Sequence, residues 1–204
     1  SRPARRSAGW GEGRMTTLII GLFIFLGIHS FRIVSETGYR AMVRRLGEGR
    51  FKGAYSLLSL IGLVLVVYGY GWARAGQGVL YDPFAGAGHL ALVLVPISFI
   101  LAAAAYVPAG HIKKTVRHPM VLGVAVWAFA HVIANGGTAD VVLFGSFFVW
   151  AVVDYLNSLG RHAPVLAERP RAKGDVLAVV AGLVVSAAFV AGLHRWLVGV
   201  SPLV

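Results

Sequence analysis

Histidine is the residue type in this sequence best suited to carry chemistry, because its neutral imidazole binds metals and its charge changes near physiological pH. The 204-residue chain contains 7 His and no Cys. Two of the His lie deep inside apolar runs: His29 in FLGIHSF (25–31) and His131 in WAFAHV (127–132). An ionisable residue in such a run is costly unless it is ligated or hydrogen-bonded. What these two His bind is therefore the first functional question.

A facing pair of His from two helices is the arrangement that ligates haem iron from both sides. The absence of Cys from this chain excludes thiolate ligands, Fe–S clusters, disulfides and covalently attached haem. The interpretations that stay open beside haem are a different metal, a proton relay, and His that only hydrogen-bond a neighbouring helix. The other His lie at the ends of apolar runs or in loops, where we interpret them as interfacial polar residues: His89, His111, His118, His162 and His194.

Helical spacing places three further side chains near the two His. Trp127 and Asn135 are at positions i−4 and i+4 of His131, so they share its face of a helix. Trp127 could pack against a macrocycle and Asn135 could hydrogen-bond near it, although ordinary core packing also accounts for a Trp there. Arg32 follows His29 by one helical turn, and its guanidinium suits a haem propionate or, alternatively, lipid headgroups.

His118 stands at the entrance of the same apolar run as His131. The two residues are 13 positions apart, which is about 20 Å along a helix, so they cannot ligate one metal ion. A layout with two haems, His118 serving an inner one and His131 an outer one, is conceivable, but it would need further inward-facing partners. For a single haem, the partner of His131 has to come from another span, and His29 is the other His inside one. At about 1.5 Å per residue, we expect His29 about 10 Å and His131 about 20 Å from the cytoplasmic edge, a difference that tilt or a longer first helix would level.

The composition is that of a membrane protein. The chain is 57% hydrophobic and 13% charged, with a mean hydropathy of +0.74, whereas soluble domains are roughly 25% charged. Apolar stretches long enough to cross a bilayer recur along it. We therefore predict an all-α, polytopic membrane bundle of about six transmembrane helices in a single domain (15–204), preceded by a disordered tail or extension (1–14). The expected spans are 17–34, 54–72, 88–107, 117–137, 139–156 and 176–197.

The basic residues predict the orientation of the spans. The chain carries 19 Lys and Arg and a net charge of +11, concentrated in the first, third and fifth loops between spans. The positive-inside rule makes those loops cytoplasmic and puts both the N- and C-termini on the non-cytoplasmic side. No aromatic-basic patch accompanies the charge, so we expect membrane lipid, and no nucleic acid, as its partner.

The first basic loop has an amphipathic segment. Between Glu36 and Leu46, apolar residues recur near helical spacing, with Arg on the opposite side. This pattern favours a short helix lying in the membrane interface, although a plain basic loop is the alternative.

Several motifs around the two His resemble the signature of the NnrU family. They are RHPM (117–120) continuing through Trp127 and His131 to Asn135-Gly136, FLGIHS (25–30), LGEGR (46–50) and LFGS (143–146). The resemblance covers roughly residues 15–156. It implies a multi-pass protein of the bacterial inner membrane, with a link to nitrite and nitric oxide reduction (denitrification).

NnrU proteins are similar to the plant 15-cis-zeta-carotene isomerase, a membrane enzyme that uses haem b to isomerise a polyene double bond. That similarity implies non-covalent haem b iron ligated by the His of a first-span His-Ser motif, His29, and by the inner His of the Arg-His-Pro span, His131. It implies a cis–trans isomerase acting on a zeta-carotene-like carotenoid or another hydrophobic, lipid-phase small molecule. The alternative is a non-enzymatic, haem-bearing accessory protein in denitrification or respiratory complex assembly, with a membrane-protein partner or a second copy of the chain. The chain lacks any Cys near His131, so ligand exchange with a thiolate is not available to it.

Overall fold

The structure is a computed structural model that describes residues 8–160 and 169–203. These residues form helices joined by short loops, with one isolated β-bridge between Val79 and Gly137. The chain divides into two compact units. Unit 1 comprises residues 1–81 and 137–146, and unit 2 comprises residues 82–136 and 147–204. The predicted all-α class is confirmed.

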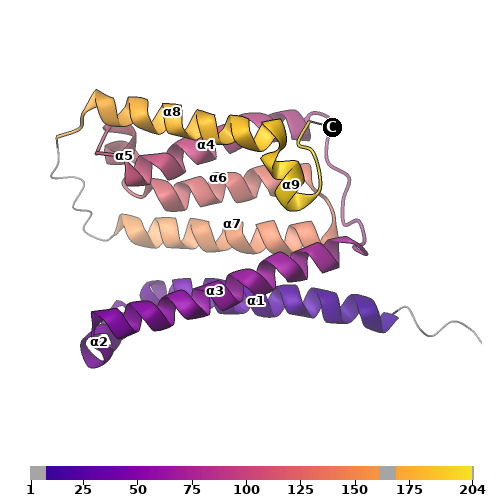
Figure 1. The fold of residues 1–204 in the computed structure, drawn as a ribbon, viewed down its shortest axis with the longest axis horizontal. Helices are drawn as coiled ribbons and strands as arrows, with labels where there is room; N and C mark the ends of the chain where they lie inside the picture. The colour runs from indigo at the N-terminus through magenta and orange to yellow at the C-terminus, as the bar shows by residue number, and fades with distance from the viewer. Residues whose placement is uncertain (1–7, 161–168, 204) are drawn as a thin grey trace, which may run out of the picture. The chain divides into compact units, whose positions relative to one another are not determined.

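Unit 1 is built on an antiparallel pair of long helices (Figure 1). The helices are α1 (Ala8–Val34) and α3 (Glu48–Arg74), joined at one end by α2 (Glu36–Leu46). Single residues separate the three helices. Ser35 caps α2 by accepting a hydrogen bond from the Gly38 N–H through its hydroxyl, and Gly47 turns the chain with φ 78°. The bounds of α2 coincide with the amphipathic segment predicted from the sequence, so that segment is confirmed as a helix.

Glycine lets the backbones of α1 and α3 touch. A Cβ on any of three glycines would lie within 2.7 Å of a backbone nitrogen of the facing helix: Gly21 against Val66, Gly62 against Phe25, and Gly69 against Leu18. The steps from Leu18 to Phe25 and from Gly69 to Gly62 have equal length, as expected of two antiparallel helices in steady register. Small residues at such crossings allow the close van der Waals packing that holds helices together in lipid.

A buried carboxylate fastens the start of α7 (Thr138–Leu159) to the end of α3. Asp140 is 5% exposed and accepts hydrogen bonds from the Tyr70 hydroxyl at 2.6 Å and from the Gln77 amide at 2.9 Å. The Gln77 carbonyl oxygen in turn accepts from the backbone N–H of Ala139, at 2.9 Å, while the Thr138 N–H donates to the Gly78 carbonyl. The acidic side chain in the first turn of α7 also suits the positive end of the helix dipole.

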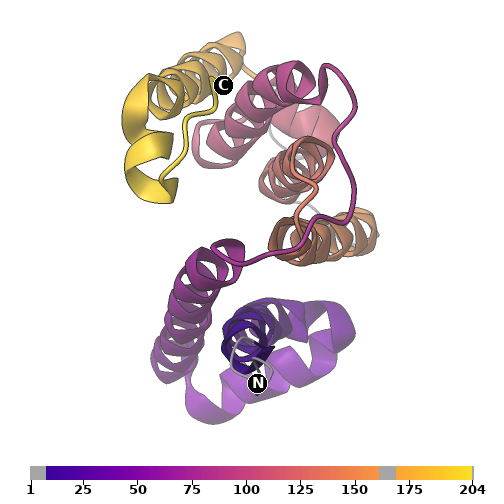
Figure 2. The ribbon, with the colours of Figure 1, turned by 90° about the vertical axis from the view of Figure 1, so that its right-hand side faces the viewer.

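Unit 2 is a helical bundle centred on α4 (Ala87–Tyr106), seen end-on in Figure 2. α4 packs against α6 (Pro119–Ala134) and α8 (Ala172–Ala188), and glycine again lies at both crossings. A Cβ on Gly123 of α6 would lie 2.9 Å from the Ser98 carbonyl oxygen, and one on Gly182 of α8 would lie 2.5 Å from the backbone of Ile100. The remaining elements are α5 (His111–Val116), a π-helical turn η2 (Phe189–Leu193), α9 (His194–Val198), and the part of α7 beyond residue 146.

Among the described residues, five helices are long and apolar enough to cross a membrane: Gly13–Val34, Glu48–Arg74, Ala87–Tyr106, Thr138–Leu159 and Ala172–Val198. They bear outward-facing apolar side chains, such as Phe23 at 80% exposed, that a soluble surface would not carry in such numbers. The remaining predicted span, 117–137, holds the shorter α6, of 16 residues. Pro119 fixes its start and the Asn135-Gly136-Gly137 sequence follows its end, so it measures about 24 Å against a hydrocarbon core of about 30 Å.

The start of α1 differs from the expectation. The helix includes residues 8–14, which were expected to belong to a tail, while residues 1–7 lie outside the described part of the chain. The sidedness of the termini and the single-domain organisation of residues 15–204 stay predictions.

The contact of α1 with α3 can be tested at one glycine. We expect Gly62→Leu to lower the melting temperature of the protein in mild detergent, because the new side chain would meet the backbone of Phe25. Overpacking of this kind costs about 1–3 kcal/mol. Gly71→Leu, on the same helix with nothing within 4 Å of its added Cβ, is the matched control and should melt like the wild type. Equal melting temperatures for the two variants would contradict the packing described for α1 and α3.

Candidate functional site

His29 lies on α1, in unit 1, with its ring held to its own helix. Its Nδ1 lies 2.6 Å from the carbonyl oxygen of Phe25, one turn back along the helix. A carbonyl oxygen can only accept, so the Nδ1–H of His29 donates this hydrogen bond. A neutral imidazole with its proton on Nδ1 carries its lone pair on Nε2, the atom that binds a metal.

Two aromatic rings pack against the His29 imidazole. The Phe25 ring lies 4.4 Å away between centroids, and the Tyr55 ring of α3 meets it edge-on at 5.4 Å and 66°. Tyr55 continues into a row of aromatic contacts with Phe51 and, beyond it, Tyr39 of α2. The rings restrict rotation of the imidazole about its side-chain bonds and thereby set the direction in which Nε2 points.

His131 lies on α6, in unit 2, and repeats the same local arrangement. Its Nδ1 lies 2.9 Å from the carbonyl oxygen of Trp127, so the Nδ1–H donates and the lone pair again falls on Nε2. The Trp127 ring packs on the imidazole at 5.2 Å, and the Phe147 ring of α7 meets Trp127 edge-on at 5.7 Å. Trp127 thus holds His131 through both its backbone and its side chain.

The donor chemistry of both His fits an axial ligand of haem. A metal-binding His typically gives its other ring N–H to a carbonyl or carboxylate, which fixes the tautomer and the ring orientation, and both His meet that condition. Within residues 8–160 and 169–203, no group of three or more His, Asp or Glu side chains gathers to hold a bare metal ion. A metal bound at these His would therefore have to bring most of its ligands with it, as haem iron does.

Two other predicted site residues have structural contacts in the described part of the chain. Asn135 ends α6, where its backbone N–H and its side-chain amide both donate to the His131 carbonyl at 3.0 Å. Arg32 forms an ion pair at 3.1 Å with Glu36, and this guanidinium, followed by that of Arg40, lowers the pKa of the Glu36 carboxyl. Whether Asn135 and Arg32 also contact a cofactor stays a prediction.

The other described His, including His194 of α9, lie at or near the starts of helices. His118 precedes Pro119 as the N-cap residue of α6, and His89 is exposed in the first turn of α4. His111 donates its backbone N–H and its Nδ1–H to one oxygen of Asp175 in α8, while the other oxygen accepts from the Ile112 N–H. Asp175 therefore caps the start of α5 from a neighbouring helix. His162 lies outside the described residues.

Sequence reasoning did not find Tyr55, Phe25 or Phe147. Phe25 could have been found, because it lies one turn before His29 on the same helix. Tyr55 and Phe147 come from other helices and need the register of the helix pairs. In unit 1, the positions of Gly21, Gly62 and Gly69 in the sequence were the signal from which the register of α1 and α3 could have been predicted.

The comparisons with known proteins gave one match. A family model described as "NnrU protein" matches residues 17–202, which include α1, α6 and both His. No curated protein and no solved structure matched the chain.

The tautomers of His29 and His131 can be measured directly. In protein labelled with ¹⁵N at histidine, at a pH where both rings are neutral, we expect the ring nitrogen shifts of these residues to report protonation at Nδ1. The reason is the hydrogen bond to a carbonyl one turn back. His29→Gln and His131→Gln assign the signals, and the exposed His89 serves as the internal comparison. Protonation at Nε2 in both residues would contradict the arrangement.

Proposed function

The chain belongs to the NnrU family, and from this premise we propose that it is a multi-pass protein of the bacterial inner membrane that binds haem b. His29 and His131 are the proposed axial ligands of the iron. The haem is non-covalent, because the chain has no Cys to form thioether bonds. The five helices in the described part of the chain that are long enough to cross a membrane support a multi-pass membrane protein.

The observation that carries the proposal is the matched state of the two His. Each is partly buried in an apolar helix, and each donates Nδ1–H to a carbonyl on its own helix. Placing two imidazoles in an apolar setting is energetically unfavourable. The two hydrogen bonds keep the lone pair of each ring on Nε2. A proton relay or a simple interhelical hydrogen bond does not require the same tautomer at both residues.

The residues around each His would orient it. On α1, Phe25 and Tyr55 hold the imidazole of His29 from two sides, and on α6 the Trp127 ring packs on His131. When bound, haem supplies a redox-active iron whose axial positions these two imidazoles control.

The activity we propose is cis–trans isomerisation of a polyene, such as a carotenoid, that reaches the protein from the lipid phase. It is supported by the resemblance of the His29-Ser30 and Arg117-His118-Pro119 motifs to those of the plant zeta-carotene isomerase, and by the apolar surfaces that the spanning helices present. The reaction changes no oxidation state, so it needs no electron donor beyond what keeps the iron reduced. The alternative is an accessory protein in nitrite and nitric oxide metabolism that carries haem without acting on a polyene.

Haem binding is tested by the absorption spectrum of protein purified from cells supplied with haem precursors. We expect a Soret band in the wild type and less than about a tenth of its haem content in the His29→Ala/His131→Ala double variant, because both axial bonds are lost. His89→Ala should keep the wild-type spectrum.

Rescue separates ligation from folding in the same experiment. His29→Gly and His131→Gly should each regain haem when imidazole is added, because the free base replaces the missing ligand. Full haem content in the double alanine variant, or failure of imidazole to restore either glycine variant while the protein stays folded, would overturn the ligand assignment.

The isomerase activity is tested separately in cells that accumulate 15-cis-zeta-carotene. Expression of the wild type should convert this substrate to its isomer, and the double alanine variant should not. Haem-loaded wild-type protein that leaves the substrate unchanged would refute the isomerase proposal, favour the accessory role and leave haem binding standing.

A further inference from the structure

Helix α2 has no buried residue and separates charge from apolar surface around its circumference. At about 100° per residue, its apolar side chains occupy one arc and its Arg side chains another. The apolar arc holds Tyr39, Met42, Val43 and Leu46, and the basic arc holds Arg40, Arg44 and Arg45. An 11-residue helix of this kind buries its apolar face at an interface and not in a protein core.

Only part of the apolar arc is covered by unit 1. Tyr39 packs against Phe31 of α1 at 6.0 Å and Phe51 of α3 at 5.0 Å between ring centroids. Met42 and Leu46 are 40% and 41% exposed and lie on the uncovered side. The helix is thus docked to its own unit along one edge and leaves apolar surface available along the other.

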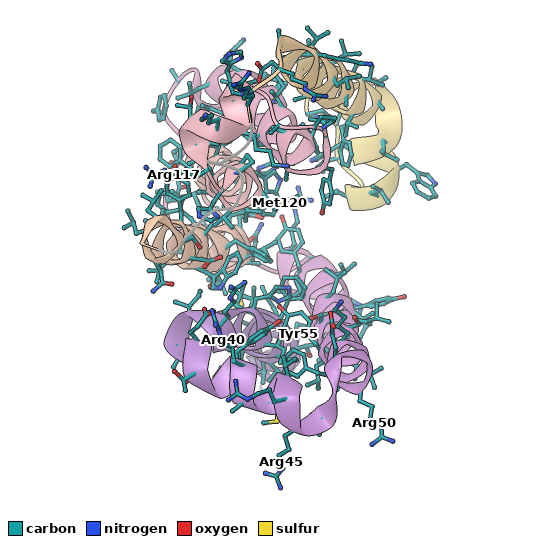
Figure 3. All side chains as sticks on the ribbon, turned by 90° about the vertical axis from the view of Figure 1, so that its left-hand side faces the viewer. Arg40, Arg45, Arg50, Tyr55, Arg117 and Met120 are labelled. Carbon is teal, nitrogen blue, oxygen red and sulfur yellow. The ribbon has the colours of Figure 1, made fainter. Side chains whose placement is uncertain are left out.

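The charges around α2 do not balance. Both acidic side chains of the region are already paired: Glu36 with Arg32 and Arg40, and Glu48 with Lys52. The guanidiniums of Arg32 and then Arg40 lower the pKa of the Glu36 carboxyl, so Glu36 stays charged. Within residues 8–160 and 169–203, no ion pair is formed by Arg44, Arg45 or Arg50. Figure 3 shows Arg45 and Arg50 extending away from the ribbon.

The position of α2 in the chain brings this surplus charge to the membrane surface. One residue, Ser35, separates α2 from the spanning helix before it, and one residue, Gly47, separates it from the spanning helix after it. Such short connections leave α2 at the level where the hydrocarbon core ends and phosphate headgroups begin. Arg pairs well with phosphate there, while neighbouring apolar side chains meet acyl chains.

We propose that α2 is a binding site for anionic phospholipid, in which Arg44 and Arg45 hold the headgroup phosphate and Met42 and Leu46 contact the acyl chains. The site is independent of haem, because it uses none of the residues around His29 or His131. It differs from general charge attraction in requiring a surplus of Arg beside exposed apolar side chains on one helix.

The absence of Cys from the chain provides a direct probe. Ala41→Cys places a single thiol on the exposed, basic side of α2 for an environment-sensitive fluorophore. The labelled full chain in mild detergent is titrated with phosphatidylglycerol, phosphatidylcholine or inorganic phosphate. We expect a saturating change with phosphatidylglycerol and no saturation with the other two, and we expect high salt to weaken it.

Paired variants locate the site. In the labelled background, Arg44→Gln/Arg45→Gln should weaken phosphatidylglycerol binding by about twenty-fivefold, from about fivefold for each basic residue at an anionic surface. Arg44→Lys/Arg45→Lys keeps the charge and should bind within a few-fold of the wild type. Arg169→Gln/Arg171→Gln removes the same charge from an exposed segment of unit 2 and should bind like the wild type.

Three results would overturn the proposal. In the first, the Arg44→Gln/Arg45→Gln variant binds phosphatidylglycerol as tightly as the wild type does. In the second, phosphatidylcholine or inorganic phosphate saturates the signal as phosphatidylglycerol does. In the third, the Arg169→Gln/Arg171→Gln pair weakens binding as much as the α2 pair does. The last result would mean that overall charge, and not α2, attracts the lipid. Size-exclusion profiles and helix content should match among the variants, and the Lys pair keeps the test decisive if the Gln pair fails to fold.

Discussion

Contact between helix backbones at glycine is the interaction on which both units depend. Lipid tails are as apolar as the side chains of these helices, so burial of apolar surface contributes little to holding them together. Close packing has to supply the attraction, and a missing Cβ is what permits it. Gly62 and Gly69 bring α3 onto α1, while Gly123 and Gly182 bring α6 and α8 onto α4. Because packing of this kind tolerates no added methyl group, it also fixes the register of each pair.

The register of α1 and α3 decides what surrounds His29. With Gly62 against Phe25, the antiparallel run places Tyr55 beside the imidazole and Phe51 beside Tyr39. The polar contacts at the helix ends reinforce the same arrangement. Asp140 ties the far end of α3 to α7 through Tyr70 and Gln77, where a buried carboxylate would be costly without those donors. The surroundings of one His thus depend on contacts along the whole length of the helix pair.

Local patterns in the sequence predicted most of the helices and placed His29 and His131 inside two of them. Apolar length predicted the spans, the alternation of Arg with apolar residues predicted α2, and Pro119 and Asn135-Gly136 predicted the ends of α6. Features that depend on two helices meeting could not be predicted in this way. Asp175 caps α5 across a gap of more than sixty residues, and Asp140 accepts its hydrogen bonds from Tyr70 and Gln77, which are also more than sixty residues away in the sequence. The site shows the same division, since Trp127 follows from helical spacing and Tyr55 does not.

The proposed ligand pair makes a physical demand on the two helices that carry it. His29 and His131 both lie near the C-terminal ends of α1 and α6, and the predicted orientation of the spans puts those ends on opposite sides of the membrane. α6 has 16 residues and is about 24 Å long, which is shorter than a hydrocarbon core of about 30 Å. The hydrogen bond of each Nδ1 to its own helix bears on this demand. It directs each Nε2 from local structure alone, so the orientation of each proposed ligand does not depend on the other unit.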